Sequence, residues 1–86
     1  MKIYPLNTVK LNKTVVIYSL NCKENIKRRL LDLGLCENTK ITPIFKSFFG
    51  DPTAYSVRDT TIALREEDSK NIFVKAHKRT SSKSNN

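Results

Sequence analysis

The β-branched and aromatic residues of this chain gather into five short runs, which are separated by turn residues and by one helical segment. The runs cover residues 14–20, 39–45, 53–58, 60–64 and 72–76. Each reads as a strand, and apolar side chains alternate along most of them, as in a strand with one buried face. Five such strands within 86 residues predict a mainly β protein, built as a small closed barrel, because closure removes the edges that make a small open sheet aggregate.

A single α-helix is predicted over residues 21–34, directly after the first strand. Asn21 is placed to cap its N-terminus, and Glu24 stands three residues later, as in a capping box. Gly34 is placed just past the helix C-terminus, where a positive φ is easiest for glycine. Three apolar side chains recur at the helical spacing and predict one buried stripe: Ile26, Leu30 and Leu33.

The second run contains a proline in its interior. Ile41, Pro43 and Phe45 alternate along this run and therefore share one face of the predicted strand. Pro43 cannot donate a hydrogen bond to a sheet ladder. The segment is therefore predicted to be an edge strand or to carry a bulge.

The remaining connections are short. Residues 50–52 read Gly-Asp-Pro, which is strong turn chemistry, and Asp59 supplies a tight turn between the third and fourth runs. Residues 65–71 are acidic and then basic, and they predict one helical turn before the last strand. Four side chains of the last two runs are expected to face the core: Ile62, Leu64, Ile72 and Val74.

The composition fits one small domain over residues 1–76, followed by a basic tail over residues 77–86. The tail is rich in Ser, Asn and Lys and has no apolar residue, so we expect it to be disordered. The chain carries a formal net charge of +8. Such a charge serves solubility, or it attracts an anionic partner such as nucleic acid, a membrane surface or an acidic protein face.

Several classes of protein are disfavoured by the sequence. Cys22 and Cys36 form neither a disulfide framework nor a Cys-x-x-Cys motif, so we expect reduced thiols. The longest apolar run is far shorter than the roughly 20 residues of a membrane span, and the N-terminus lacks the apolar stretch of a signal peptide. We expect a soluble intracellular protein.

Catalysis and tight metal binding find no support in the residue types present. His77 is the only histidine, and no phosphate-cradling Gly-x-x-x-x-Gly-Lys-Ser/Thr loop occurs, so we expect no enzyme and no bound cofactor. Cys22 and Cys36 flank a predicted helix about 18 Å long and should not share one ion. Three neighbouring acids could still hold ferrous iron or another divalent metal loosely: Glu66, Glu67 and Asp68.

Four blocks of the chain, in this order, resemble the FeoA family of ferrous iron uptake. They are Arg-Leu-Leu-Asp-Leu-Gly at 29–34, Gly-Asp-Pro at 50–52, Ala-Leu-Arg at 63–65 and Ile-Phe-Val at 72–74. The resemblance covers most of residues 6–74. It implies a small SH3-like barrel of five strands, with one α-helix after the first strand and a short helical turn before the last. The positions that match the family motifs are Arg29, Leu30, Leu33, Gly34, Gly50, Asp51, Pro52, Leu64 and Arg65.

The chain also departs from the family pattern. Asn12, Asn38 and Asp59 stand where the family usually has glycine. Asn and Asp tolerate the left-handed backbone best after glycine, so we expect the same backbone at these positions. Phe48 replaces a common proline, and Pro43 replaces a β-branched residue.

The resemblance implies a role in protein contact rather than a reaction. FeoA-like proteins support iron import by FeoB, a membrane transporter with its own G-protein domain. We therefore expect a non-enzymatic cytoplasmic accessory protein that reaches the inner face of the cell membrane only through this partner. The candidate partner-binding residues are Phe48, Phe49, Asp51, Arg28 and Arg29.

Each of these residues also has a plain structural interpretation. Phe48 and Phe49 could cap the open end of the barrel, and Arg28 and Arg29 could form an ordinary solvated helix face. Arg65 is expected to be structural, either neutralising backbone carbonyls or pairing with a nearby acid such as Asp32 or Asp51.

Two other functions remain open. Small basic barrels often bind nucleic acid, but that use needs aromatics interleaved with Lys and Arg on one exposed strand face. Here Tyr18, Phe45, Tyr55 and Phe73 are scattered over the predicted strands. The chain could also be a stand-alone regulatory module, since metal-dependent repressors carry the same barrel as a terminal domain. No helix-turn-helix segment supports direct promoter binding.

Overall fold

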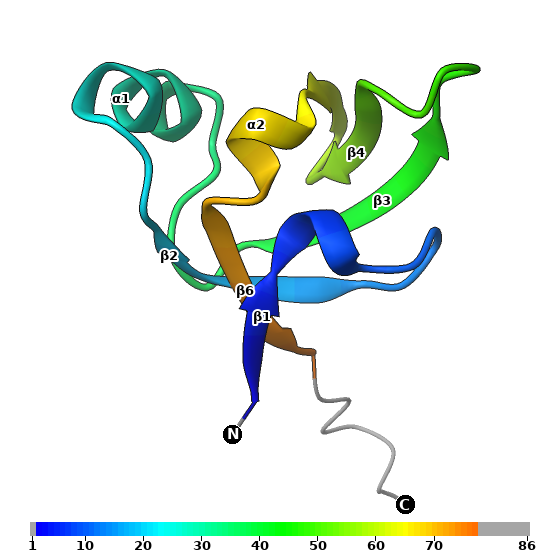
Figure 1. Cartoon of the computed structure of the whole chain (residues 1–86). Helices are drawn as coiled ribbons and strands as arrows, with labels where there is room; N and C mark the ends of the chain where they lie inside the picture. Colours follow the sequence, from blue (N-terminus) through cyan, green and yellow to red (C-terminus); the bar gives the residue numbers. More distant parts are fainter. Residues whose placement is uncertain (1, 78–86) are drawn as a thin grey trace, which may run out of the picture.

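The computed structural model describes residues 2–77, which form one curled antiparallel sheet with three short helical elements (Figure 1). The strands follow the order β1-β6-β2-β3-β4-β5 across the sheet. They are β1 (Ile3–Pro5), β2 (Val15–Leu20), β3 (Lys40–Lys46), β4 (Thr53–Val57), β5 (Thr60–Leu64) and β6 (Ile72–Ala76). The helical elements are the 3-10 turn η1 (Leu6–Thr8), α1 (Glu24–Asp32) and α2 (Glu66–Ser69). The predicted mainly β architecture is confirmed, with six strands instead of five. The predicted tail lies outside the described residues except for His77.

The additional strand is β1, which forms one edge of the sheet. Ile3, Tyr4 and Pro5 pair with the end of β6, and three residues are too few to show a period in the sequence. In the described part of the chain, β1 and β5, the two edge strands of the sheet, form no ladder with each other. The gap is bridged by helical turns, because η1 contacts α2 and the Asn7 amide donates to the Glu66 carboxylate at 3.3 Å.

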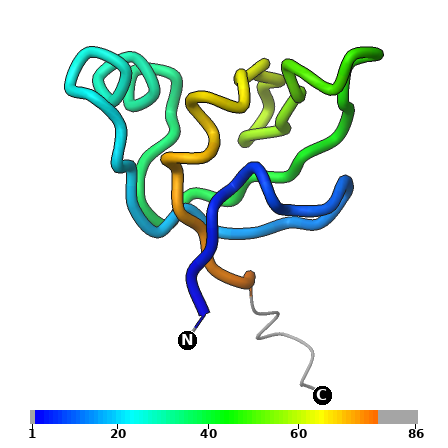
Figure 2. Tube along the Cα trace, viewed as in Figure 1, coloured from blue at the N-terminus to red at the C-terminus, as the bar shows by residue number. Residues whose placement is uncertain are grey.

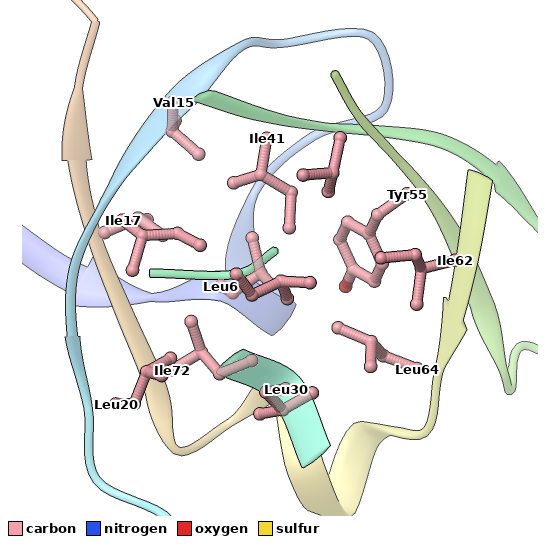
Figure 3. Close-up of a cluster of buried hydrophobic side chains, with 13 residues drawn as sticks. Leu6, Val15, Ile17, Leu20, Leu30, Ile41, Tyr55, Ile62, Leu64 and Ile72 are labelled. Atoms are coloured by element: carbon pink, nitrogen blue, oxygen red, sulfur yellow. The ribbon is translucent and has the colours of Figure 1, made fainter. Parts of the chain in front are cut away.

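The core lies inside the curl of the sheet and is almost wholly aliphatic (Figure 3). Strand alternation supplies most of it, and the four inward-facing side chains expected from β5 and β6 are all buried. Leu6 from η1 and Leu30 from α1 are fully buried among the strand side chains. Burial of one such leucine stabilises the fold by roughly 1.5–3 kcal/mol, so the helices are integral to the core.

The helix begins later than its cap pattern predicts. The residue that caps α1 is Lys23, with no hydrogen bond from its side chain, so the predicted Asn21–Glu24 capping box is wrong. The Asn21 backbone N–H instead donates to the Asn71 carbonyl at 2.8 Å. This bond holds the end of β2 beside the start of β6, and the helix starts only after it.

The C-terminus of α1 follows the expected glycine stop. Gly34 has φ of +98°, its N–H donates to the Leu31 carbonyl, and the Leu35 N–H donates to the Leu30 carbonyl. This is the Schellman arrangement, and Leu35 is fully buried like Leu30. The predicted stripe is wrong at Leu33, which is 46% exposed because the chain turns there and Leu35 enters the core instead.

Strand β3 carries the predicted bulge, but it is not an edge strand. It pairs with β2 and β4, and its register with β4 shifts between Pro43 and Phe45. The pairs with β2 involve only Lys40 and Ile41, so the missing N–H of Pro43 interrupts no ladder. The extra residue, Ile44, reverses the alternation, and Phe45 is 63% exposed although Pro43 is buried.

Two of the three expected left-handed positions are confirmed. Asn12 has φ of 68° and Asn38 has φ of 72°. In the β4–β5 hairpin, the positive φ (57°) falls on Arg58 and not on Asp59. The two-residue turn joins the paired residues Val57 and Thr60, and such turns place a positive φ at their first central residue.

Candidate partner-binding site

The family-like blocks, although distant in sequence, meet around the short helix α2. The Arg29 guanidinium lies 3.8 Å from the Asp68 carboxylate and ties α1 to α2. The Asp51 carboxylate accepts a hydrogen bond from the Glu66 backbone N–H at 2.8 Å. The other oxygen of Asp51 lies 4.0 Å from the Arg65 guanidinium. Three of the four blocks therefore hold α2 in place directly.

Asp51 caps a helix to which it is not adjacent in the sequence. The first N–H groups of a helix have no partner within it, and the residue before α2, Arg65, supplies no side-chain cap. A carboxylate from the β3–β4 loop fills this role. Of the two acids expected near Arg65, Asp51 is the one that pairs with it. The Asp51–Arg65 ion pair is exposed and 4.0 Å long, so it contributes little to stability. The 2.8 Å hydrogen bond to the Glu66 N–H is the stronger contact of Asp51.

The loop between β3 and β4 presents two aromatic side chains to solvent. Phe48 is 94% exposed and Phe49 is 89% exposed, and their rings meet edge to face with centroids 5.1 Å apart. We call Phe48 and Phe49 the aromatic tip. It does not cap the barrel core, so that alternative interpretation is wrong. Phe45, at 63% exposure on the adjoining strand, extends the exposed apolar surface.

Helix α1 presents a mixed basic and apolar face. Arg28 and Arg29 are exposed, and Leu31 and Leu33 are each nearly half exposed. Figure 1 and Figure 2 show α1, α2 and the β3–β4 loop on the side of the molecule away from the start of β1. The exposure of Leu31 and Leu33 was not predicted. For Leu31, the sequence indicated its exposure only through its position beside the predicted apolar stripe.

The groups that could bind metal or attack a substrate are mostly engaged or protonated. Burial, together with the negative charge of Asp68, raises the pKa of the Cys22 thiol, so it is neither an activated nucleophile nor a ready thiolate ligand. Cys36 Sγ lies 3.2 Å from the Thr39 hydroxyl. Among the expected loose iron ligands, Asp68 pairs with Arg29 and Glu66 bonds Asn7.

Residues 2–77 contain no cluster of three His, Cys, Asp or Glu side chains that could hold a metal ion. In the same part of the chain, no helix has the length and apolar character needed to cross a membrane.

The fold defines a small SH3-like barrel with an exposed aromatic tip. Comparison with family models gives one match, to the FeoA domain, over residues 4–76. The chain therefore belongs to the FeoA family, whose members are associated with ferrous iron transport. A search of curated proteins returned no match.

Solved structures agree with this assignment. The FeoA-like protein of Clostridium acetobutylicum is 26% identical, with 94% of this chain and 98% of that chain covered and a TM-score of 0.79. The zinc-complexed FeoA of Stenotrophomonas maltophilia, described as a prokaryotic SH3 domain protein, is 27% identical, with 83% and 88% covered and a TM-score of 0.72.

A third similar structure is a manganese-dependent transcriptional repressor in complex with manganese. It is 11% identical, with 90% of this chain but only 38% of that chain covered and a TM-score of 0.80. At this identity the likeness concerns the fold alone.

Proposed function

We propose that this chain is a non-enzymatic accessory protein of ferrous iron uptake, which acts by contact with the cytoplasmic part of a FeoB-type membrane transporter. Membership of the FeoA family supports a role in ferrous iron uptake. The exposed aromatic tip carries the proposal that the mode of action is contact, because nothing within the fold uses these two rings.

The aromatic tip has the properties of an interface anchor. Two adjacent phenylalanines in water are unfavourable, and burying each against a partner gains roughly 1.5–3 kcal/mol. Aromatic and arginine side chains are enriched among the residues that dominate binding energy, and large exposed apolar patches mark interaction sites. The loop that carries the tip is held by the Asp51–Glu66 hydrogen bond, so less ordering is required on binding.

Arg28 and Arg29 fit the charged margin of the same interface. Both are exposed on α1, and Leu31 and Leu33 add apolar area to that helix. Arg29 also pairs with Asp68, so Arg28 has more freedom to meet a partner carboxylate.

The non-enzymatic role rests on the chemistry of the available groups. The only histidine of the chain, His77, follows β6, and Figure 1 shows the end of β6 away from α1, α2 and the β3–β4 loop. The raised pKa of Cys22 disfavours its thiolate.

A pull-down against membranes that contain a FeoB-type transporter tests the proposal. The full chain serves as bait at moderate salt, and the transporter is identified by antibody or mass spectrometry. Recovery of the transporter that persists when salt is raised supports contact through an apolar centre. Absence of the transporter under both conditions contradicts the proposal.

The net charge and the fold likeness to a repressor support a second candidate, a barrel that binds nucleic acid or regulates transcription. A nucleic-acid complex weakens linearly in log salt, since each neutralised phosphate releases counterions. Recovery of nucleic acid in place of the transporter, lost steeply as salt rises, would favour this second candidate.

A further inference from the structure

A hollow of about 860 Å³ lies between β1, β2 and β6, on surfaces that the proposed transporter contact does not use. Three lysines line it, Lys2, Lys13 and Lys75, and its apolar walls include Tyr4, Val16 and Ala76. We call this hollow the lysine groove. It lies toward the start of β1 and the end of β6, whereas the aromatic tip lies on the side of the helices (Figure 1).

The lysine groove is positively charged and uncompensated within its own walls. No carboxylate is among its lining residues. The salt bridges within residues 2–77 join Arg29 to Asp68 and Arg65 to Asp51, so neither engages a lysine of the groove. Three ammonium groups around one concavity repel each other, and an anionic ligand relieves that repulsion.

Two of the amines of the lysine groove each lie over an aromatic ring. The Lys13 ammonium lies 6.0 Å from the centroid of the Tyr4 ring, and the Lys75 ammonium lies 5.8 Å from the centroid of the Tyr18 ring. The two amines are thus placed over different rings, on two different strands. Carboxylates spaced along a peptide chain can reach amines that lie over different rings.

The apolar walls require an apolar group between the charges. Tyr4 packs against the core and is half-buried, and Val16 is half-buried on the neighbouring strand β2. The Thr8 hydroxyl, also in the lining, already donates to the Pro5 carbonyl at 2.7 Å and offers little further specificity. A side chain such as leucine or phenylalanine matches these walls better than a polar one.

We propose that the lysine groove binds an extended acidic peptide segment, in which glutamate or aspartate side chains flank an apolar residue. The carboxylates meet Lys2, Lys13 and Lys75, and the apolar side chain packs against Tyr4, Val16 and Ala76. A flat membrane surface fits less well, because its headgroups would not reach the apolar walls of a concave site. This inference does not depend on the proposed transporter contact.

The test uses a short fluorescent peptide of alternating glutamate and leucine, with a glutamine–leucine peptide as its neutral counterpart. The full chain is titrated at low and at physiological salt, and amide shifts are mapped by NMR. We expect binding of the acidic peptide alone, with the largest shifts in residues 2–16 and 75–76. Absence of binding, equal binding of both peptides, or shifts centred on another face would overturn the proposal.

Matched charge variants separate the groove from general charge attraction. Lys13→Gln/Lys75→Gln is expected to weaken peptide binding about five- to tenfold, as expected for the loss of two solvent-accessible charge pairs. Lys46→Gln/Lys70→Gln removes the same charge at exposed positions outside the groove and should change the affinity less than about twofold. Equal weakening in both double variants would contradict a specific site.

A third variant guards against misfolding. If Lys13→Gln/Lys75→Gln lowers the unfolding temperature, Lys2→Gln/Lys13→Gln replaces it, since both of its side chains are exposed. Vesicles containing phosphatidylserine and a short single-stranded DNA are the competing probes. If either probe binds more tightly than the acidic peptide, and the same groove variant loses this binding, the groove would be assigned to that partner instead.

Discussion

At the scale of single residues, backbone conformation explains several positions better than side-chain contact does. The positive φ values at Asn12 and Asn38 were predicted, because asparagine tolerates the left-handed region. The positive φ at Arg58 was not predicted. In this two-residue hairpin, the register of β4 and β5 makes Arg58 the first central residue of the turn, which takes the positive φ. Asp59 is the second central residue.

Gly34→Ala tests the backbone demand at the end of α1. An added Cβ would meet nothing within 4 Å, so the cost comes only from the φ of +98°. We expect a loss of about 1–2 kcal/mol in the free energy of unfolding, measured by urea denaturation. Asn25→Ala, at an exposed site within α1, is the control and should be neutral or slightly stabilising. An unchanged stability of Gly34→Ala would show that the Schellman turn is not strained by a side chain.

Tyr55 gives the fold a pH dependence in alkaline solution. Burial raises the pKa of its phenol above the unfolded value of about 10. Because the pKa of the Tyr55 phenol is higher in the folded state, the stability that the buried neutral phenol contributes is fully present below pH about 10. It is lost as pH rises through the folded-state pKa. We expect Tyr55→Phe to show a shallower loss of unfolding free energy than the wild type above pH about 10. A decline of the same steepness in both proteins would contradict this account.

At the scale of elements, a run of acidic and then basic residues predicted the single turn of α2, and alternation predicted the β4–β5 hairpin and the last strand. These elements bury one face each, so their side-chain period is visible in the residues. Strand β1 is too short to show a period, and the register shift between Pro43 and Phe45 breaks the alternation of β3, which leaves Phe45 exposed. The start of α1 was misplaced because the Asn21 backbone is used by the neighbouring strand connection.

Loop and helix are coupled through Asp51. We expect Asp51→Ala to lower the free energy of unfolding by about 1 kcal/mol, within the usual cost of losing a helix cap. Asp51→Asn keeps an acceptor oxygen and should therefore lower the free energy of unfolding by less. Both are compared by urea denaturation with Asp59→Ala, which changes an exposed turn acid. Equal stability of Asp51→Ala and Asp59→Ala would mean that the remote cap contributes nothing.

Candidate contact residues were recognised in the sequence, but their geometry was not. Adjacent phenylalanines before a Gly-Asp-Pro turn indicated either a cap or an anchor, and only the structure shows both rings in solvent. The lysine groove had no sequence signal. It unites residues from the first and last strands, whose proximity follows from the β1–β6 pairing.

At the scale of the whole molecule, residues 2–77 form a small barrel with two separate surfaces. The helix side carries the aromatic tip, and the opposite side carries the lysine groove. The family-like blocks mainly hold α2 and the β3–β4 loop in place, which leaves the exposed tip free to meet a partner.

The metal chemistry of the intact chain can be tested directly. We expect anaerobic titration with Fe(II) to show binding weaker than micromolar, because Asp68 and Glu66 are engaged and the Cys22 thiol has a raised pKa. The readout is competition with a chromogenic chelator. Stoichiometric submicromolar binding would overturn this expectation and would require a site that residues 2–77 of the single chain do not display.

The most direct test of the central claim is the affinity of the purified chain for a FeoB-type transporter held in lipid nanodiscs. Phe48→Ser/Phe49→Ser is compared with the wild type and with Tyr18→Ser, which removes a partly exposed aromatic ring from β2. We expect the double variant to remain folded and to bind about tenfold or more weakly, and Tyr18→Ser to stay within about twofold of the wild type. Wild-type affinity in a folded double variant would contradict contact through the aromatic tip, and absence of binding by the wild-type chain would contradict the accessory role itself.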